Sequence, residues 1–339
     1  MREPSFWWRQ EAAVPAAVSA LLAPLAAVYG AIAARRLRRD GKAAAIPVVC
    51  VGNLTVGGAG KTPAALAVAL LLRAAGEQPA FLSRGYGGRL AGPIRIDPAT
   101  HTASGVGDEP MLLARLAPTI VARDRVAGAK AAAAAGASVL VMDDGFQNPS
   151  LRKDFSVLVV DARRGIGNGR VMPAGPLRAP LAPQLERAHA LLIVGSGAVP
   201  TLPDVQARRI PLFRARLTPD ADSIAALGNS RVLAFAGIGD PEKFFATLKD
   251  AGIEVARTRS FADHHRYRRA EIRELCVQAD RDGLTLVTTE KDLARLKGDP
   301  AAAELCARAQ ALPVVLAFDD ETGFAALLRQ RVTAARSTV

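Results

Sequence analysis

Short apolar segments alternate along the chain with longer ones in which apolar residues recur every three or four positions. The short segments are rich in Val, Ile and Leu and predict buried β-strands. They lie at residues 46–51, 79–82, 119–122, 139–142 and 157–160. The longer segments between them predict helices. Such alternation is typical of a mostly parallel sheet flanked by helices, so the sequence predicts an α/β fold.

The same pattern divides the chain into three parts. Residues 1–44 predict a hydrophobic or amphipathic helical segment, and residues 45–228 contain the strands of the main sheet. A fresh apolar strand at 232–236 begins further α/β units, so residues 229–339 predict a second, smaller α/β domain. The segment 163–183 is rich in Gly, Pro and Arg, as functional loops are.

The N-terminal segment has the composition of a membrane-associated helix. Residues 12–34 lack charged side chains and are long enough to cross a bilayer. However, Pro15 and Pro24 interrupt the run, and its bulky apolar residues gather on one face, opposite Ala, Ser and Gly. Such a helix lies in a membrane interface or docks on the protein itself. The adjacent Trp7 and Trp8, with the basic cluster that follows the run, favour peripheral membrane contact, while a spanning helix stays open. That cluster comprises Arg35, Arg36, Arg38, Arg39 and Lys42.

A glycine-rich loop follows the first strand of the core and leads into a helix. It contains GGAGKT at residues 57–62, which is typical of phosphate-binding loops (P-loops). Glycines let backbone N–H groups face phosphate oxygens, Lys61 reaches the β- and γ-phosphates, and the Thr62 hydroxyl ligates Mg²⁺. The usual pattern has glycine where Thr55 stands, so this loop is a variant. The residues predicted to bind the phosphates of ATP are Thr55, Val56, Gly57, Gly58, Ala59, Gly60, Lys61 and Thr62.

Two carboxylates end the strand predicted at 139–142. Ligands collect at the carboxyl ends of parallel strands, and in P-loop enzymes an aspartate there supports Mg²⁺. We therefore predict that Asp143 and Asp144 join Thr62 around the metal. Asp161 ends another strand, at 157–160, and is predicted to be structural.

Charge and cysteine content narrow the classes of function. The chain has 44 Lys and Arg against 32 Asp and Glu, a net charge of +12, which favours anionic partners such as phosphorylated ligands or an acidic membrane face. The charge is dispersed and no nucleic-acid-binding motif stands out, so no nucleic-acid partner is expected. Three widely spaced cysteines, with no CxxC pair, argue against a disulfide scaffold or a zinc ribbon.

Ordered sequence blocks over nearly the whole chain make it similar to a known family, the tetraacyldisaccharide 4′-kinases, which are the lipid A 4′-kinases of Gram-negative bacteria. The blocks are GNLTVGGAGKTP (52–63), LSRGYGG (82–88), GDEP (107–110), DDGFQ (143–147), PAGPLR (173–178), FAGIGDPEKFF (235–245), FADHH (261–265) and TTEKD (288–292). The P-loop alone indicates only a nucleotide-binding protein, whereas the joint set in this order is specific.

This resemblance implies an enzyme that uses ATP and Mg²⁺ to phosphorylate the 4′-hydroxyl of a tetraacylated glucosamine disaccharide 1-phosphate during lipid A synthesis. It also implies a P-loop core, a smaller C-terminal domain that closes over the nucleotide, and peripheral or monotopic attachment to the cytoplasmic face of the inner membrane. No protein partner is predicted. The alternative is a membrane-targeting or partitioning P-loop ATPase, but those proteins typically have lysine before GGxGKT, where this chain has Val56.

The resemblance also assigns catalytic roles. Asp108, in the GDEP block, matches the family's catalytic aspartate and is the candidate base, whereas its local context alone predicts a helix N-cap. His264 matches the histidine that pairs with that aspartate. The substrate-binding candidates are Arg84, Tyr86, Glu109 and Arg178.

Four positions depart from the family pattern. Ala59 replaces a threonine inside the loop, Asn148 a histidine, and Asp240 an asparagine. Ala179 stands where the family often has glutamate, so any metal or substrate role of that glutamate is absent here.

Overall fold

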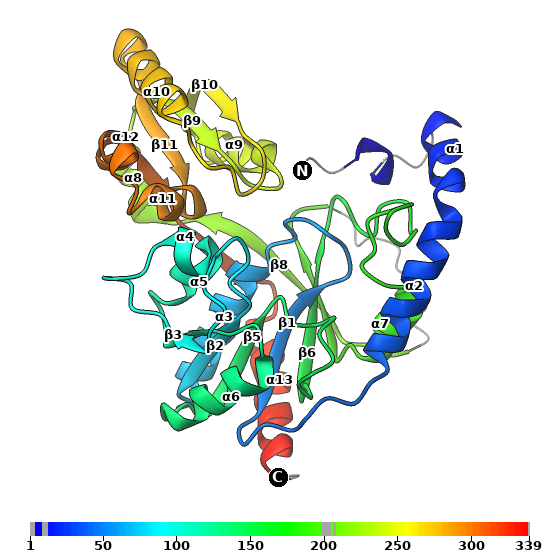
Figure 1. Ribbon diagram of the computed structural model, residues 1–339. Coiled ribbons are helices and arrows are strands. Elements are labelled where there is room, and N and C mark those ends of the chain that lie inside the picture. The colour runs from blue at the N-terminus through cyan, green and yellow to red at the C-terminus, as the bar shows by residue number, and fades with distance from the viewer. Residues whose placement is uncertain (1–3, 9–12, 198–204, 206–207, 338–339) are drawn as a thin grey trace.

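The computed structural model describes residues 4–8, 13–197, 205 and 208–337, and the rest of the chain lies outside the described residues. Its larger part is a nine-stranded sheet in the order β13-β8-β7-β6-β1-β5-β2-β4-β3 (Figure 1). The strand pairs are parallel except β3–β4 and β13–β8. The strands are β1 (Val48–Asn53), β2 (Pro79–Ser83), β3 (Ile94–Arg95), β4 (Thr119–Val121), β5 (Val139–Asp143), β6 (Phe155–Asp161), β7 (Ala190–Val194), β8 (Leu212–Pro219) and β13 (Val314–Phe318).

Helices cover both faces of this sheet, because its central strands are apolar on both sides. One core contains side chains of α3 (Lys61–Ala74) and α13 (Glu321–Arg336), and the other contains residues of α6 (Arg125–Ala134) and α7 (Leu181–Glu186). The short helices α4 (Ala103–Val106) and α5 (Asp108–Leu113) follow β3. The α/β prediction for the core is confirmed.

A second sheet of four parallel strands forms the smaller domain above the large sheet in Figure 1. Its order is β10-β9-β11-β12, with apolar cores on both faces. The strands are β9 (Arg231–Ala236), β10 (Glu254–Ser260), β11 (Thr285–Thr289) and β12 (Gln310–Leu312). The helices are α8 (Ala221–Leu227), α9 (Pro241–Asp250), α10 (Arg269–Asp282), α11 (Glu290–Leu296) and α12 (Ala303–Arg308), with a 3₁₀ turn at Pro300–Ala302.

Residues 314–336 differ from the sequence-based division, which assigned everything after 229 to the smaller domain. They return to the large sheet as β13 and α13. The chain therefore passes between the domains twice, and the two connections lie side by side, since Asp220 N–H donates to the carbonyl of Pro313. Nothing in the local sequence indicates that an edge strand of the large sheet, β13, comes from the end of the chain.

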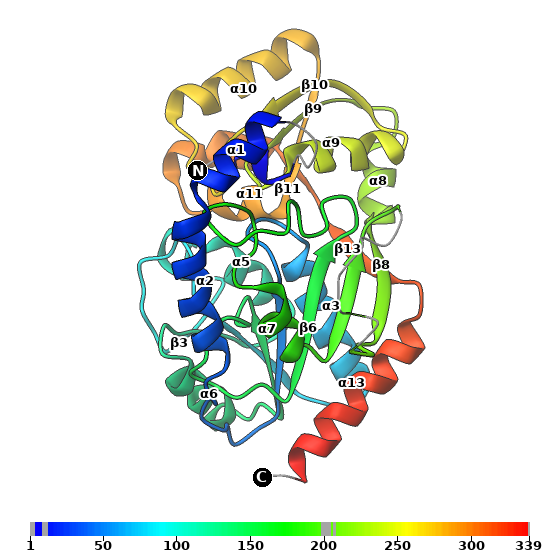
Figure 2. The ribbon, with the colours of Figure 1, turned by 90° about the vertical axis from the view of Figure 1, so that its right-hand side faces the viewer.

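The N-terminal region forms a short 3₁₀ turn (Ser5–Trp7) and two helices, α1 (Ala13–Leu21) and α2 (Ala23–Leu37). Helix α2 runs along one side of the large domain, and α1 extends beyond it to the height of the small domain (Figures 1 and 2). Residues 1–3 and 9–12 of the predicted N-terminal segment lie outside the described residues. Pro24 stands in the first turn of α2, so the predicted run is divided there. Within the described part of the chain, no helix has both the length and the apolar character that crossing a bilayer requires.

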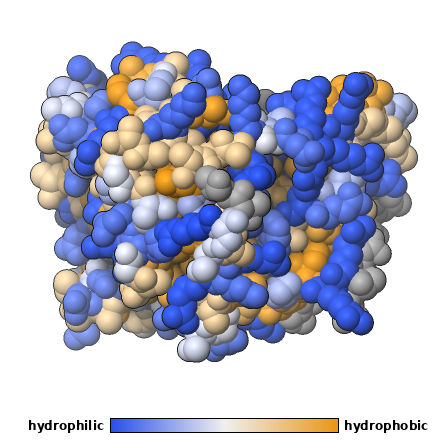
Figure 3. Space-filling model, turned by 90° about the horizontal axis from the view of Figure 1, so that it is seen from below, coloured by the Kyte–Doolittle hydropathy of each residue, from blue (hydrophilic) through white to orange (hydrophobic). Residues whose placement is uncertain are grey.

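Mostly small residues attach these helices to the protein, together with Leu37 at the end of α2, which belongs to a core of the large domain. Ser19, Ala26 and Gly30 are buried, and the Ser19 hydroxyl donates to the carbonyl of Ala174. The bulky side chains on the opposite face point outward. They are Val18, Leu21, Leu25, Val28, Tyr29 and Ile32, with exposed fractions from 38% to 81%. The described residues seen from below in Figure 3 form no such uniform apolar face, because hydrophilic and apolar residues alternate over the surface in that view.

Candidate active site

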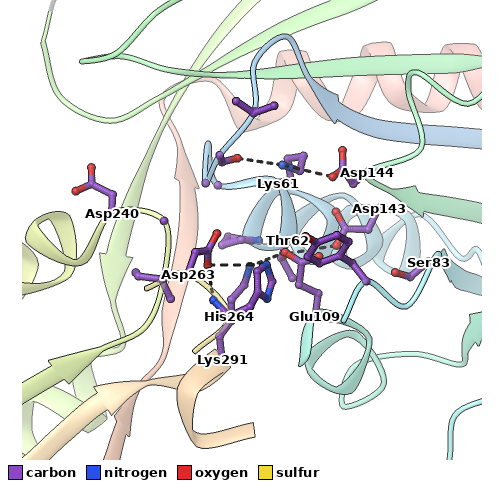
Figure 4. Close-up of a pocket in the computed structure, with 18 of the residues that line it drawn as sticks. Lys61, Thr62, Ser83, Glu109, Asp143, Asp144, Asp240, Asp263, His264 and Lys291 are labelled. Carbon is purple, nitrogen blue, oxygen red and sulfur yellow. Dashed lines mark hydrogen bonds and ion pairs between the residues drawn. The ribbon is translucent and has the colours of Figure 1, made fainter. Parts of the chain in front are cut away.

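A cleft of about 720 Å³ lies between the two domains and beside α2. Its wall includes the P-loop, the end of β5, the FADHH loop, and residues Tyr29, Ile32 and Arg36 of α2. Most of the predicted site residues meet here although they are far apart in the sequence (Figure 4). Those that line the cleft are Val56, Gly57, Gly58, Gly60, Lys61, Thr62, Arg84, Tyr86, Glu109, Asp143, Asp144, Arg178 and His264.

The P-loop has the backbone shape that its glycines predict. Gly57 and Gly60 have φ values of 97° and 89°, which favour glycine, and Gly60 is the N-cap of α3. The PAGPLR block supports the loop from outside, because the Val56 N–H donates to the carbonyl of Pro176 and Arg178 Nε donates to the carbonyl of Thr55. The helix N-terminus and the loop therefore have the backbone shape and positive potential that suit the phosphates of a nucleotide.

Two predicted P-loop residues do not face the cleft. Thr55 is buried in a bridge with Leu177, and Ala59 packs in the core of the large sheet. The side chain at position 59 therefore points away from the phosphate site, so the departure from threonine to Ala59 removes no group from that site.

Asp144 is surrounded by positive charge. Arg178 binds it with both terminal nitrogens, at 2.6 and 3.1 Å, and Lys61 Nζ lies 3.7 Å from Oδ2. Burial alone raises the pKa of Asp144, but Lys61 and Arg178 outweigh burial and lower it. Asp144 is thus an anion that fixes the two cations at the phosphate site.

Asp143 is the group that best fits a metal ion. Its Oδ2 lies 3.3 Å from the Thr62 hydroxyl, whereas Oδ1 is buried and has no hydrogen-bond partner among the described residues. Burial, with Glu109 and Asp144 nearby, raises the pKa of Asp143. The part of the chain that the structure describes holds no group of three or more His, Cys, Asp or Glu at ligating spacing. Mg²⁺ usually takes one or two protein ligands and completes its shell with water and phosphate oxygens, so Thr62 and Asp143 suit it.

Asp108 and His264 meet across the two domains. His264 Nδ1 lies 3.1 Å from Asp108 Oδ2, and Arg295 Nε donates to the same oxygen at 2.6 Å. Burial raises the pKa of Asp108, but the bond with His264 and the charge of Arg295 hold it well below its usual range. The bond to Asp108 raises the pKa of His264. The predicted pair is therefore assembled.

The pair has an unexpected orientation. His264 lines the large cleft, whereas Asp108 is only 4% exposed and lines a smaller cavity of about 330 Å³ on the other side of the imidazole. His264 and Asp144 also have positive φ, at 56° and 54°, which is uncommon for residues with a Cβ. Backbone strain of this kind is concentrated at functional sites.

Glu109 is tied to the small domain instead of reaching freely into the cleft. Lys291 Nζ lies 2.7 Å from its carboxylate. Burial raises the pKa of Glu109, but the charges of Lys291 and Lys61, together with the hydrogen bond from Lys291, outweigh burial and lower it. A further ion pair, Lys243 with Asp161 at 3.0 Å, also joins the domains. Asp161 thus has the structural role that the sequence predicted, and Asp240 adds to the junction through Arg163 and Arg164.

The remaining candidates also lie in the wall of the cleft. Arg84 and Tyr86 are exposed, and the Tyr86 ring lies 5.1 Å from His264. The sequence reasoning missed Arg125, whose buried side chain lines the same wall and has no partner for Nε within the described residues. Burial and Arg84 lower the pKa of Arg125, so this wall suits an anionic group. Arg125 is the first residue of α6 and belongs to none of the sequence blocks, so no motif in the sequence pointed to it.

Positions 148 and 179 differ in what they contribute. Asn148 lines the cleft, and its side chain accepts hydrogen bonds from Ser150. Ala179 is fully buried, and its carbonyl accepts a hydrogen bond from Gln184. No carboxylate from position 179 therefore contributes to this site.

Comparison with known proteins gives the same family throughout. The family model described as tetraacyldisaccharide-1-P 4′-kinase matches residues 18–333. A tetraacyldisaccharide 4′-kinase of Rhodopseudomonas palustris (strain BisA53) is 56% identical over 99% of this chain and 97% of the relative. One of Methylobacterium sp. (strain 4-46) is 59% identical over 98% of both. The crystal structure of LpxK from Aquifex aeolicus in complex with ATP has a TM-score of 0.71 and 26% identity, over 93% of this chain and 99% of that one.

Proposed function

The chain belongs to the tetraacyldisaccharide-1-P 4′-kinase family, and on that premise we propose how its residues transfer the phosphoryl group. The enzyme phosphorylates the 4′-hydroxyl of a tetraacylated disaccharide 1-phosphate, a lipid A precursor, with ATP as the donor. The alternative, a partitioning ATPase, is thereby set aside. Three different groups of residues bind the nucleotide, activate the hydroxyl and bind the lipid.

The nucleotide phosphates bind the P-loop. Backbone N–H groups of Gly57 to Gly60 and the N-terminus of α3 surround them, and Lys61 neutralises charge on the β- and γ-phosphates. Lys61 lies in the cleft, where its Nζ donates to the Gly57 carbonyl at 3.3 Å. Thr62 and Asp143 hold Mg²⁺, and Asp144 keeps Lys61 and Arg178 in place. When bound there, Mg²⁺ would supply positive charge that offsets the negative charge of the phosphate oxygens.

Asp108 and His264 act as a unit that removes the proton of the 4′-hydroxyl. Their 3.1 Å contact, beside the cleft and the P-loop, is the observation on which this assignment rests. Proton removal makes the hydroxyl oxygen a better nucleophile for the γ-phosphorus. Arg84, Tyr86, Glu109 and Arg178 stay candidates for holding the sugar and its 1-phosphate, and Arg125 joins them.

A lipid substrate explains why α2 forms part of the cleft. Tyr29 and Ile32 belong both to the exposed apolar face of α1 and α2 and to the cleft wall. That face suits the acyl region of a membrane, and Arg35 and Arg36 at the end of α2 suit anionic head groups. We therefore assign the protein to the cytoplasmic face of the inner membrane, as a peripheral protein whose substrate enters the cleft from the bilayer.

The direct test follows label from ATP to lipid. The full-length protein is incubated with γ-phosphate-labelled ATP, Mg²⁺ and the tetraacylated disaccharide 1-phosphate in detergent or vesicles, and lipid products are separated. Label in a product phosphorylated at the 4′ position is expected. Hydrolysis of ATP without labelled lipid would contradict the proposal. The Asp108→Asn variant, which keeps the shape of the side chain, is the matched control for the catalytic pair.

A further inference from the structure

Lys291, the second residue of α11, is a cation that the small domain places in the cleft. The cleft wall contains Lys291 together with the P-loop and Lys61 (Figure 4). Its Nζ lies 2.7 Å from Oε1 of Glu109, on α5 of the large domain, and its side chain is 27% exposed. Helix α11 packs against α5, so the ion pair joins two elements that already touch. The Lys291 ammonium therefore has a defined position at the domain junction.

The charge of Lys291 reaches the same carboxylates as the charge of Lys61. Burial raises the pKa of Glu109, Asp143 and Asp144, and both lysines oppose that rise at each of the three. The attraction between charges falls off with distance, so the two ammonium groups, one from each domain, surround a small group of acidic side chains. A γ-phosphate that contacts Lys61 beside Asp143 therefore also lies in the field of Lys291.

Lys291 is charged and still has free donors. Burial lowers the pKa of Lys291, but Glu109, Asp108 and Asp143 outweigh burial and raise it, so the side chain is an ammonium at neutral pH. An ammonium group has three N–H donors. Within the described part of the chain, its one hydrogen-bond acceptor is Glu109 Oε1. Two donors are therefore available for the oxygens of a phosphate.

The place of this ion pair distinguishes it from others that join the domains. Arg115, which pairs with a residue of α11, does not line the cleft, and Lys243 lines it whereas its partner Asp161 does not. Both Lys291 and Glu109 belong to the cleft wall. A ligand that fills the cleft therefore lies against this pair, so the pair can act on the ligand as well as hold the domains together.

Resting on the proposed kinase function, we propose that Lys291 is a catalytic residue that donates to an oxygen of the γ-phosphate from the small domain, while Lys61 does so from the P-loop. In the transfer step the 4′-oxygen forms a bond to the γ-phosphorus. The bond from that phosphorus to the β–γ bridging oxygen breaks, and its electron pair leaves with ADP. The hydroxyl proton passes to the Asp108–His264 unit, and Lys291 stays protonated throughout. Glu109 keeps one hydrogen of the ammonium and so holds Lys291 in place.

This arrangement makes the γ-phosphate a link between the domains. Negative charge that spreads over its oxygens in the transition state meets one cation from each domain. ATP contacts Lys61 and Lys291 together, whereas ADP ends at the β-phosphate and contacts Lys61 alone. Loss of the Lys291 charge should therefore weaken the binding of ATP more than that of ADP. A lysine that only neutralised Glu109 would affect the two nucleotides alike.

The first experiment measures nucleotide binding to full-length Lys291→Met without lipid. Titration calorimetry in Mg²⁺ compares ADP with an ATP analogue whose β–γ bridging oxygen is replaced by a methylene group. The dissociation constant of the analogue is expected to rise about tenfold or more, because a charged hydrogen bond is lost, while that of ADP changes less than about threefold. With labelled ATP and saturating lipid, kcat should fall about 100-fold or more.

Lys249→Met is the matched control, because it removes an exposed lysine of α9 in the same domain and should behave like the wild type in both measurements. Equal weakening of the two nucleotides by Lys291→Met, or an unchanged kcat, overturns the proposal. Thermal unfolding identifies a variant that fails to fold. In that case the double variant of the second experiment decides.

The second experiment separates the action of Lys291 on phosphate from its action on Glu109. Lys291→Met leaves the Glu109 carboxylate without its partner, which by itself destabilises the protein. Lys291→Met combined with Glu109→Gln removes both charges, and Glu109→Gln alone is the reference. The double variant should regain thermal stability, yet its kcat should lie at least about tenfold below that of the reference and its preference for the analogue over ADP should stay reduced. A double variant equal to the reference in both respects overturns the proposal.

The two levels of the argument can fail separately. Transfer of label from ATP to the lipid by the wild-type protein tests the kinase function. The comparison of ADP with the ATP analogue needs no lipid, so it tests Lys291 alone. Normal transfer by the wild type with equal weakening of both nucleotides in Lys291→Met would remove the role of Lys291 and leave the kinase function standing.

Discussion

His264 Nδ1 and Asp108 Oδ2 lie 3.1 Å apart, although 156 positions separate the residues in the chain and they belong to different domains. The contact therefore exists only while the small domain sits against the large one. Three ion pairs beside it, Arg295 with Asp108, Lys291 with Glu109 and Arg115 with Glu290, act across the same junction. Assembly of the catalytic pair and approach of the domains are thus one event.

This coupling predicts non-additive losses of activity. Asp108→Asn and His264→Ala should each lower kcat about 10²- to 10⁴-fold, with little effect on ATP binding, because each change disables the same proton-accepting unit. The double variant should then be less than about tenfold slower than the worse single variant. Steady-state kinetics at saturating ATP and lipid gives the comparison. Losses that multiply fully would mean that the two residues act independently.

Lys61 should be indispensable for transfer. The Lys61→Ala variant loses a cation that lies between the Gly57 carbonyl and Asp144. In the proposed function this cation neutralises charge on the γ-phosphate. We expect kcat to fall about 10³-fold or more, since stabilisation of the transition state is lost. Lys130→Ala, an exposed lysine on α6, is the control with the same chemical change. Near-normal turnover of Lys61→Ala would reject the P-loop assignment.

The Thr62 hydroxyl should matter for Mg²⁺ and not for folding. Thr62→Val has nearly the same shape but no oxygen, so the Mg²⁺ concentration for half-maximal activity should rise at least about tenfold. Thr62→Ser keeps the oxygen and should stay within about threefold of the wild type. Titration of Mg²⁺ at fixed ATP measures both. Equal Mg²⁺ requirements in the two variants would remove Thr62 from the metal site.

The pH dependence of kcat follows from the direction in which the pKa of His264 is shifted. The bond with Asp108 raises the pKa of His264 above its usual 6.5. An imidazolium cannot accept a proton, so kcat should fall as the pH decreases through a value above 6.5, not below it. The measurement is kcat across the neutral pH range and well to either side of it, with both substrates saturating. An acid limb centred well below the usual value for histidine is the result that contradicts the paired arrangement.

Much of this site was predictable because its chemistry lies in local motifs. The loop from Gly57 to Thr62 and the acidic end of β5 place phosphate and metal groups through backbone geometry that a few adjacent residues determine. The Asp108–His264 pair was predicted only from the family resemblance. Local sequence around Asp108 predicts a helix N-cap, whereas the structure puts Asp108 inside the first turn of α5, after an N-cap at Gly107.

Other features of the site and the fold could not be predicted from the local sequence. Arg125 and Arg295 stand in ordinary helical segments, and their roles arise from which element packs against them. The return of β13 to the large sheet likewise depends on pairing with β8, almost a hundred residues earlier. The apolar stripe in α1 and α2 was visible as a pattern, but periodicity alone could not decide whether its bulky or its small side faces the protein.

The exposed stripe on α1 and α2 should bind membranes, and this can be tested without removing the helices. Leu25 and Val28 are each 63% exposed, so Leu25→Asp with Val28→Asp should leave folding intact. Burying two such side chains in a bilayer is worth about 3–6 kcal/mol, so binding to vesicles of anionic phospholipid should fall at least about 100-fold.

The control and the kinetics make this last prediction specific. Val277→Asp changes a residue that is 56% exposed on α10 in the small domain, and it should bind vesicles like the wild type. Because Ile32 and Tyr29 line the cleft beside the stripe, loss of membrane contact should raise the apparent KM for lipid presented in vesicles. It should leave the KM for ATP unchanged, since the P-loop is untouched. Co-sedimentation with vesicles that is equal in all three proteins would show that the stripe does not attach the enzyme to lipid.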